Sequence, residues 1–103
     1  MTRPAARPTV MVDDARVRLT RFDLAPDAET GWHAHVHVHD HAIAAVTDCI
    51  IVLEEPGGGT REVVVPMGAA HRREAGGEHN VVNAGRAAMS FVAVALKEPA
   101  PAA

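Results

Sequence analysis

The 103-residue chain is expected to fold as a single all-β domain, a barrel or jelly roll. Val accounts for 14 of its 23 Leu, Ile, Val and Phe residues, and β-branched side chains favour strands. The apolar residues occur in short runs separated by Pro, Gly and Asp, without a stripe at helical spacing. A chain of this length also has room for only one hydrophobic core.

The composition argues against several classes of partner. The net charge is −3, and the nine Arg and one Lys are dispersed, so no basic stripe favours nucleic acid. No apolar run approaches the ~20 residues of a membrane span, and the start of the chain lacks the apolar stretch of a secretory signal. The single cysteine, Cys49, cannot form an internal disulfide, which is typical of a reducing compartment. We therefore expect a cytoplasmic protein in which Cys49 is a small buried residue.

The two ends of the chain are rich in Pro and Ala. Residues 1–13 are expected to form an N-terminal arm that is mobile or pairs with a partner chain, and residues 98–103 a disordered tail. Residues 14–97 would form the barrel. Within the arm, residues 9–12 are predicted as a first short strand.

The second strand is predicted at residues 16–24, before a turn at Ala25-Pro26-Asp27. Its apolar positions change parity between Leu19 and Phe22. A β-bulge near Thr20 or Arg21 would bring both sets to one face.

Turn-forming residues delimit the later strands. The segment from Pro56 to Gly59 gives the clearest hairpin signal of the sequence, and Gly76 and Gly77 mark a further turn. Asn83 is expected to tie the turn that follows it, through a hydrogen bond from its side chain to the backbone. The remaining strands are predicted at residues 30–38, 42–47, 49–54, 60–65, 71–74, 79–83 and 88–97.

The chain has seven histidines, and five of them alternate along one short segment: His33, His35, His37, His39 and His41. Residues two apart on a strand face the same way, so His33 and His35 can present two imidazoles to one metal ion. A third imidazole must come from elsewhere, and His79, which follows a glycine turn, is the natural candidate. Trp32 is expected to pack in the core beside this segment. The alternative is a surface tract of histidines that binds metal adventitiously.

Two groups of residues resemble the two motifs of the cupin family. Residues 31–35, Gly-Trp-His-Ala-His, are similar to the start of the first motif, which normally continues to a Glu; His39 and Asp40 stand there instead. Glu74 replaces the Pro of the second motif. The glycines, histidine and asparagine of that second motif are present at the family spacing: Gly68, Gly76, His79 and Asn83. The motifs and their flanks span residues 16–97, and the resemblance implies the cupin double-stranded β-helix, a jelly-roll barrel.

By this resemblance, His33, His35 and His79 take the places of the three histidine ligands of the cupin metal site. The fourth ligand is open. Counting forward from His35 selects His39 or Asp40, and counting back from the Thr47 turn selects His41. His39 and His41 share one strand parity, which favours a histidine over the carboxylate.

A set of imidazoles suits a divalent transition metal, Fe, Ni, Cu, Zn or Mn, without ranking them. The resemblance implies dioxygenase-like chemistry on a small-molecule substrate. His71 stands where related small cupins often carry an aromatic residue, and it is a candidate to point into the pocket as an acid or base. One alternative is a barrel that binds or senses a small ligand without turnover, and another is a metal-free structural barrel. Chain length and family resemblance both point to a homodimer.

Overall fold

A computed structural model describes residues 2–32, 41–73 and 79–97. All the regular secondary structure in these residues is β-strand. The described part of the chain has no helix with the length and hydrophobicity that crossing a membrane requires.

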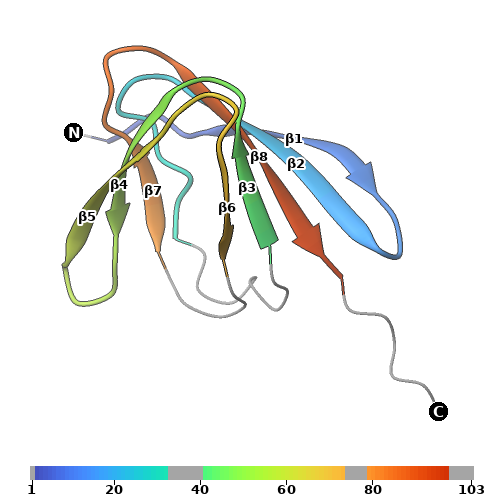
Figure 1. Ribbon diagram of the computed structural model, residues 1–103. Coiled ribbons are helices and arrows are strands. Elements are labelled where there is room, and N and C mark those ends of the chain that lie inside the picture. The colour runs from blue at the N-terminus through green and yellow to red at the C-terminus, as the bar shows by residue number, and fades with distance from the viewer. Residues whose placement is uncertain (1, 33–40, 74–78, 98–103) are drawn as a thin grey trace.

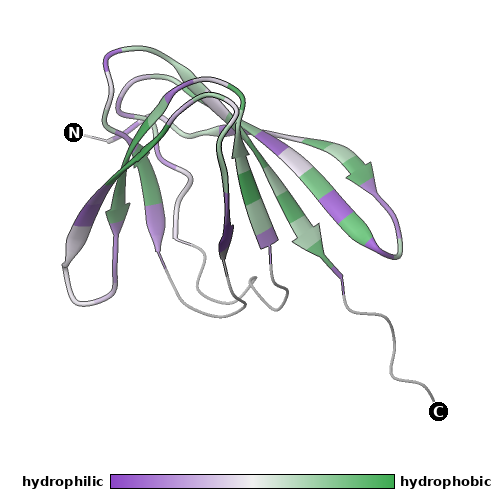
Figure 2. Cartoon of the chain, in the orientation of Figure 1, coloured by the Kyte–Doolittle hydropathy of each residue, from purple (hydrophilic) through white to green (hydrophobic). Residues whose placement is uncertain are grey.

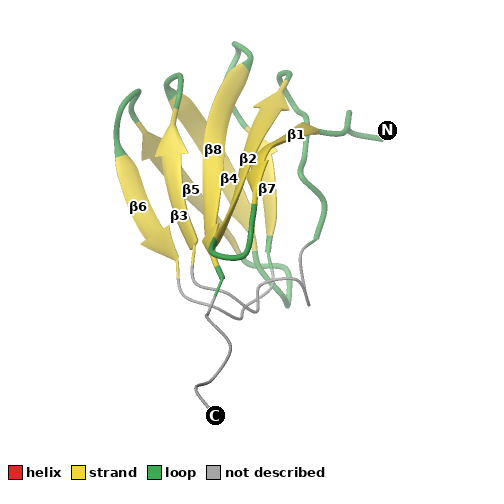
Figure 3. Cartoon of the chain, turned by 90° about the vertical axis from the view of Figure 1, so that its right-hand side faces the viewer, coloured by secondary structure: helices red, strands yellow, loops and turns green. Residues whose placement is uncertain are grey.

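The strands form two antiparallel sheets that face each other (Figures 1 and 3). The larger sheet has the order β1-β2-β8-β3-β6, and the smaller sheet has the order β5-β4-β7. The strands are β1 (Arg7–Asp13), β2 (Val17–Leu24), β3 (His41–Ala45), β4 (Cys49–Glu54), β5 (Thr60–Val65), β6 (Ala70–Arg73), β7 (Asn80–Asn83) and β8 (Met89–Leu96). This arrangement confirms the predicted all-β jelly roll.

The predicted ranges of β4 and β5 coincide with the observed strands. The predicted ranges of the other six strands agree with the structure to within two residues at each end. The hairpin between β4 and β5 turns at Gly57 and Gly58, whose φ angles of 88° and 92° favour glycine. Most of the strand predicted at residues 30–38 lies outside the described residues, as does the turn at Gly76 and Gly77.

The bulge predicted in the second strand is wrong. β2 pairs with β8 in unbroken register from Val17 to Leu24. The irregularity lies in the neighbouring strand instead, where the register of β1 against β2 shifts between Val10 and Val12. The extra residue therefore belongs to the exposed edge strand, and β2 keeps its alternation beside the core.

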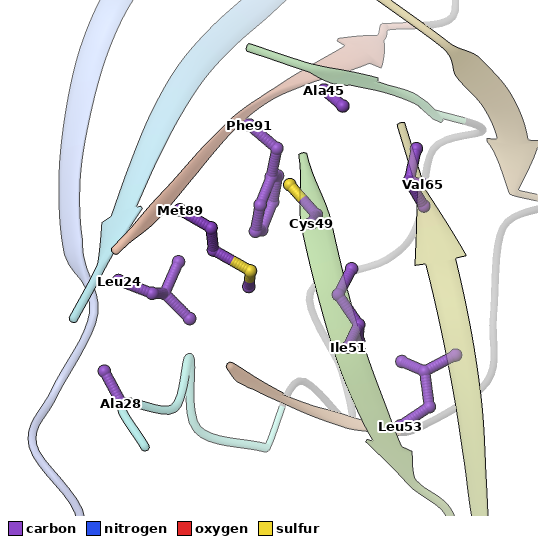
Figure 4. Packing of buried hydrophobic residues seen from close by; sticks show 9 residues of the cluster. All are labelled: Leu24, Ala28, Ala45, Cys49, Ile51, Leu53, Val65, Met89 and Phe91. Atoms are coloured by element: carbon purple, nitrogen blue, oxygen red, sulfur yellow. The ribbon is translucent and has the colours of Figure 1, made fainter. Parts of the chain in front are cut away.

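The hydrophobic core lies between the sheets (Figure 4). Phe22 and Phe91 pair across β2 and β8, and their rings stack with centroids 5.2 Å apart. Cys49 is buried in this core, as predicted, and burial raises the pKa of its thiol. The buried cluster consists of Leu24, Ala28, Ala45, Cys49, Ile51, Leu53, Val65, Met89 and Phe91.

Two extended segments continue the smaller sheet beyond β7. The amide of Thr30 donates a hydrogen bond to the carbonyl of Val81 (2.9 Å), and Ala6 donates one to the carbonyl of Glu29 (2.8 Å). The N-terminal residues thus run beside the segment that ends at Trp32.

Candidate functional site

A cavity of about 100 Å³ lies between the two sheets. Six of the strands contribute to its wall: β2, β3, β4, β6, β7 and β8. Most of the described lining is apolar, as in many small-molecule sites. The apolar lining residues are Phe22, Ile43, Ile51, Leu53, Val81, Phe91 and Ala93.

Three histidines interrupt this apolar wall: His41, His71 and His79. His41 is the first residue of β3 and lies two residues before Ile43, so both side chains face the cavity. His71, in β6, is paired with Ile43 and so also faces inward. Figure 2 shows hydrophilic residues at the lower ends of β3, β6 and β7, at one end of the sandwich. The fold therefore brings imidazoles from three elements to one cavity.

The remaining predicted ligands, His33, His35, His39 and the alternative Asp40, lie outside the described residues. Of the predicted set, the structure thus places His41, His71 and His79 around one cavity.

The donor chemistry of these histidines fits a divalent transition metal, since neutral imidazole is a ligand for Fe, Ni, Cu and Zn. Within residues 2–32, 41–73 and 79–97, however, no group of three or more His, Cys, Asp or Glu side chains is arranged to hold a metal ion. A complete ligand set would therefore have to include residues outside these ranges, as the predicted ligands His33 and His35 are.

A polar network around one buried amide lies directly beside His79. The side chain of Asn80 is inaccessible to solvent, and its Nδ2 donates hydrogen bonds to Glu29 (2.9 Å) and Glu54 (2.8 Å). Arg3 binds both carboxylate oxygens of Glu54, at 2.9 and 3.2 Å. The Arg3 guanidinium and the Asn80 amide hold the pKa of Glu54 below its usual range.

Sequence reasoning missed this network because 51 residues separate Arg3 from Glu54. The only local signal was Asn80, a polar residue next to His79, near the start of the strand predicted at residues 79–83.

The comparison with solved structures decides the family. A cupin domain from Bordetella pertussis Tohama I is 36% identical, superposes with a TM-score of 0.88, and is matched over 95% of this chain and 99% of its own. This chain belongs to the cupin family. No protein-family model matches the sequence.

Two further relatives of this cupin have functional names. The Beta-alanine degradation protein BauB of Pseudomonas aeruginosa is 44% identical over 95 residues, which cover 92% of this chain and 97% of BauB. The polyketide cyclase RemF from Streptomyces resistomycificus is 26% identical, with a TM-score of 0.69 and coverage of 98% of this chain and 73% of RemF.

The structure also tests two structural predictions near the cupin motifs. Asn83 ties the following turn as predicted: its Nδ2 donates to the carbonyl of Ala87 (3.0 Å), and its Oδ1 accepts from the amide of Gly85 (2.9 Å). The prediction that Trp32 packs in the core is wrong, because 49% of its surface is exposed. Gly31 just before it has a φ of 87°, which is not the backbone conformation of a regular strand.

Proposed function

We propose that this cupin is a metal-dependent enzyme that acts on a small organic molecule, with dioxygenase-like chemistry at a divalent transition metal. The observation that carries the proposal is the convergence of His41, His71 and His79 on one apolar cavity. Neutral imidazoles are common ligands for divalent transition metals, and they also serve as acids or bases toward a polar substrate.

The metal would be held by His33, His35 and His79, with His39 or His41 as the fourth ligand. When bound, it would supply Lewis-acid or redox chemistry. His71 is left to serve as the acid or base that moves a proton to or from the substrate. The apolar wall would exclude water from the reacting groups.

The size of the cavity limits the substrate. About 100 Å³ is well below the several hundred Å³ of a site for a drug-sized ligand, which supports a substrate of only a few carbon atoms. The similarity to BauB supports a substrate from β-alanine breakdown, whose carbon chain has three atoms. We therefore propose a three-carbon acid as the substrate class.

Oxygen consumption tests this function. Protein loaded with Fe(II) is mixed with β-alanine and with three-carbon hydroxy- and oxo-acids, and oxygen uptake is recorded. We expect uptake with at least one acid, in which the substrate is oxidised and dioxygen is reduced. We also expect His71→Gln to lose most of this rate, by roughly 100-fold, while keeping its iron.

The largely apolar cavity wall favours a second candidate, a barrel that holds a small ligand without turnover. Calorimetry that detects binding of a three-carbon acid to protein that takes up no oxygen would support this candidate instead.

We also propose that the protein is a cytoplasmic homodimer. β1 is the outermost strand of the larger sheet and exposes three successive apolar side chains, Val10, Met11 and Val12. An exposed apolar edge strand is suited to pairing with a second chain. The lone buried Cys49 agrees with a reducing compartment.

A further inference from the structure

One buried amide connects two segments that are distant in the sequence. Asn80 is the first residue of β7 and is 0% exposed. Its Oδ1 accepts a hydrogen bond of 2.9 Å from the amide of Gly31, 49 residues away. Asn80 directly follows His79, and Gly31 lies two residues before His33. The side chain of Asn80 thus joins the two segments that carry the proposed metal ligands.

The other side of the same amide is held by two carboxylates. Glu29 and Glu54 both accept hydrogen bonds from Nδ2 of Asn80, which brings two negative charges close together. Arg3 offsets their repulsion, because its Nη1 lies 2.9 Å from Glu54 and 3.8 Å from Glu29. The backbone holds Arg3 in place, since Glu29 donates a hydrogen bond to the carbonyl of Pro4 (2.9 Å).

We propose that the hydrogen-bonded side chains of Arg3, Glu54 and Asn80, here called the relay, act as positioning residues. They fix the separation between the segment before His33 and the segment at His79. The N-terminal arm then sets the affinity of the metal centre without touching the metal. This inference rests on the proposed function for its effect on metal, whereas the relay itself belongs to the metal-free protein.

The physical basis is the control of ligand position by groups outside the ligand set. A metal site loses affinity when its ligands can drift, and the partners that orient ligands typically contribute 10- to 100-fold. If Arg3 is removed, repulsion between Glu29 and Glu54 shifts Asn80, and Gly31 loses a well-placed acceptor. Both ligand-bearing segments then move relative to each other.

Asn83 provides a matched control on the same strand. It is 1% exposed and makes three hydrogen bonds, as Asn80 does, but its partners are backbone groups of Leu24, Gly85 and Ala87. Loss of Asn83 should therefore lower stability without altering the metal centre.

The test is a titration of metal-free protein with Co(II), followed by visible absorption, at a temperature where each variant is folded. We expect Asn80→Ala to raise the dissociation constant by roughly 10- to 100-fold and to change the Co(II) absorption band. Arg3→Ala should raise it several-fold, and Arg3→Lys should restore part of the loss. Asn83→Ala should bind Co(II) like the wild type. Equal Co(II) affinity in Arg3→Ala and the wild type would overturn the proposal.

Arg3→Ala decides the test if Asn80→Ala does not fold, because the Arg3 side chain is 41% exposed and its loss leaves the core intact. If the wild type binds no Co(II), the proposed metal function fails. The relay is then tested separately, by the rate of amide hydrogen exchange at Gly31 in metal-free protein. Faster exchange of Gly31 in Arg3→Ala supports it, and unchanged exchange overturns it.

Discussion

Ala93 has the smallest side chain among the described residues that line the cavity, and its size controls the available volume. Ala93→Leu adds three carbons to a space of about 100 Å³. We expect turnover of a three-carbon acid to fall by at least roughly tenfold. The free energy of unfolding should stay within about 1 kcal/mol, because the new side chain occupies existing space.

Metal content and urea denaturation complete this test. Ala88→Leu, an equal change at an exposed position just before β8, is the control and should keep full activity. Full activity in Ala93→Leu as well would contradict the assignment of this cavity as the substrate site.

The pairing of Arg3 with Glu54 predicts a pH dependence of stability. The pKa of Glu54 is lowered in the folded protein, so its contribution is complete above the ordinary value of 4.5 and is lost as the pH falls through the lowered pKa. Arg3→Ala removes the main cause of this shift. We expect the stability difference between wild type and Arg3→Ala to be largest near about pH 7 and to shrink below about pH 4.

Urea midpoints at several pH values measure that difference. Because Arg3 is partly exposed, the difference should also decrease at high salt. A difference that grew toward acid pH would mean that Glu54 gains nothing from this ion pair in the folded protein.

Among the elements, the hairpin between β4 and β5 offers a direct test of backbone conformation. Gly58 has a φ of 92°, and a Cβ at this position would meet no atom within 4 Å, so the cost of Gly58→Ala is conformational only. We expect the free energy of unfolding to fall by about 1–2 kcal/mol. Gly59→Ala is the control, because this glycine has no positive φ; it should be neutral or slightly stabilising. Equal urea midpoints for both variants would disprove the predicted turn conformation.

The same hairpin shows which elements the sequence makes predictable. The inner ends of β4 and β5 follow from local chemistry, since a Pro-Gly-Gly-Gly turn separates the two strands. The position of the bulge does not follow from local chemistry, because a change of parity of the apolar residues in β2 does not reveal the register of the neighbouring strand β1. Register between strands depends on residues far apart in the chain, and the prediction near Thr20 failed for that reason.

The candidate site also contains residues that the sequence predicted and residues that it did not. Strand parity and family resemblance singled out His41, His71 and His79, and all three line one cavity. The network of Arg3, Glu54 and Asn80 was not predictable, because it depends on three-dimensional proximity between the N-terminal residues and the ends of β4 and β7. Trp32 was misplaced because an aromatic residue alone does not reveal the positive φ of Gly31 before it.

At the scale of the whole molecule, the exposed apolar edge of β1 predicts association. Light scattering combined with size-exclusion chromatography should give the mass of two 10.9-kDa chains. Met11→Lys places a charge on this edge and should shift the mass toward the monomer, since edge charges oppose strand pairing. A monomer mass for the wild type would rule out the homodimer.

We propose a metal centre whose ligands include His79, one of the histidines that line the cavity. Metal content by mass spectrometry tests it most directly, on wild type and His79→Ala, both untagged and never exposed to a nickel column. We expect about one transition metal per chain in the wild type and the loss of most of it in the variant. No metal in the wild type, or equal metal in both proteins, would contradict it.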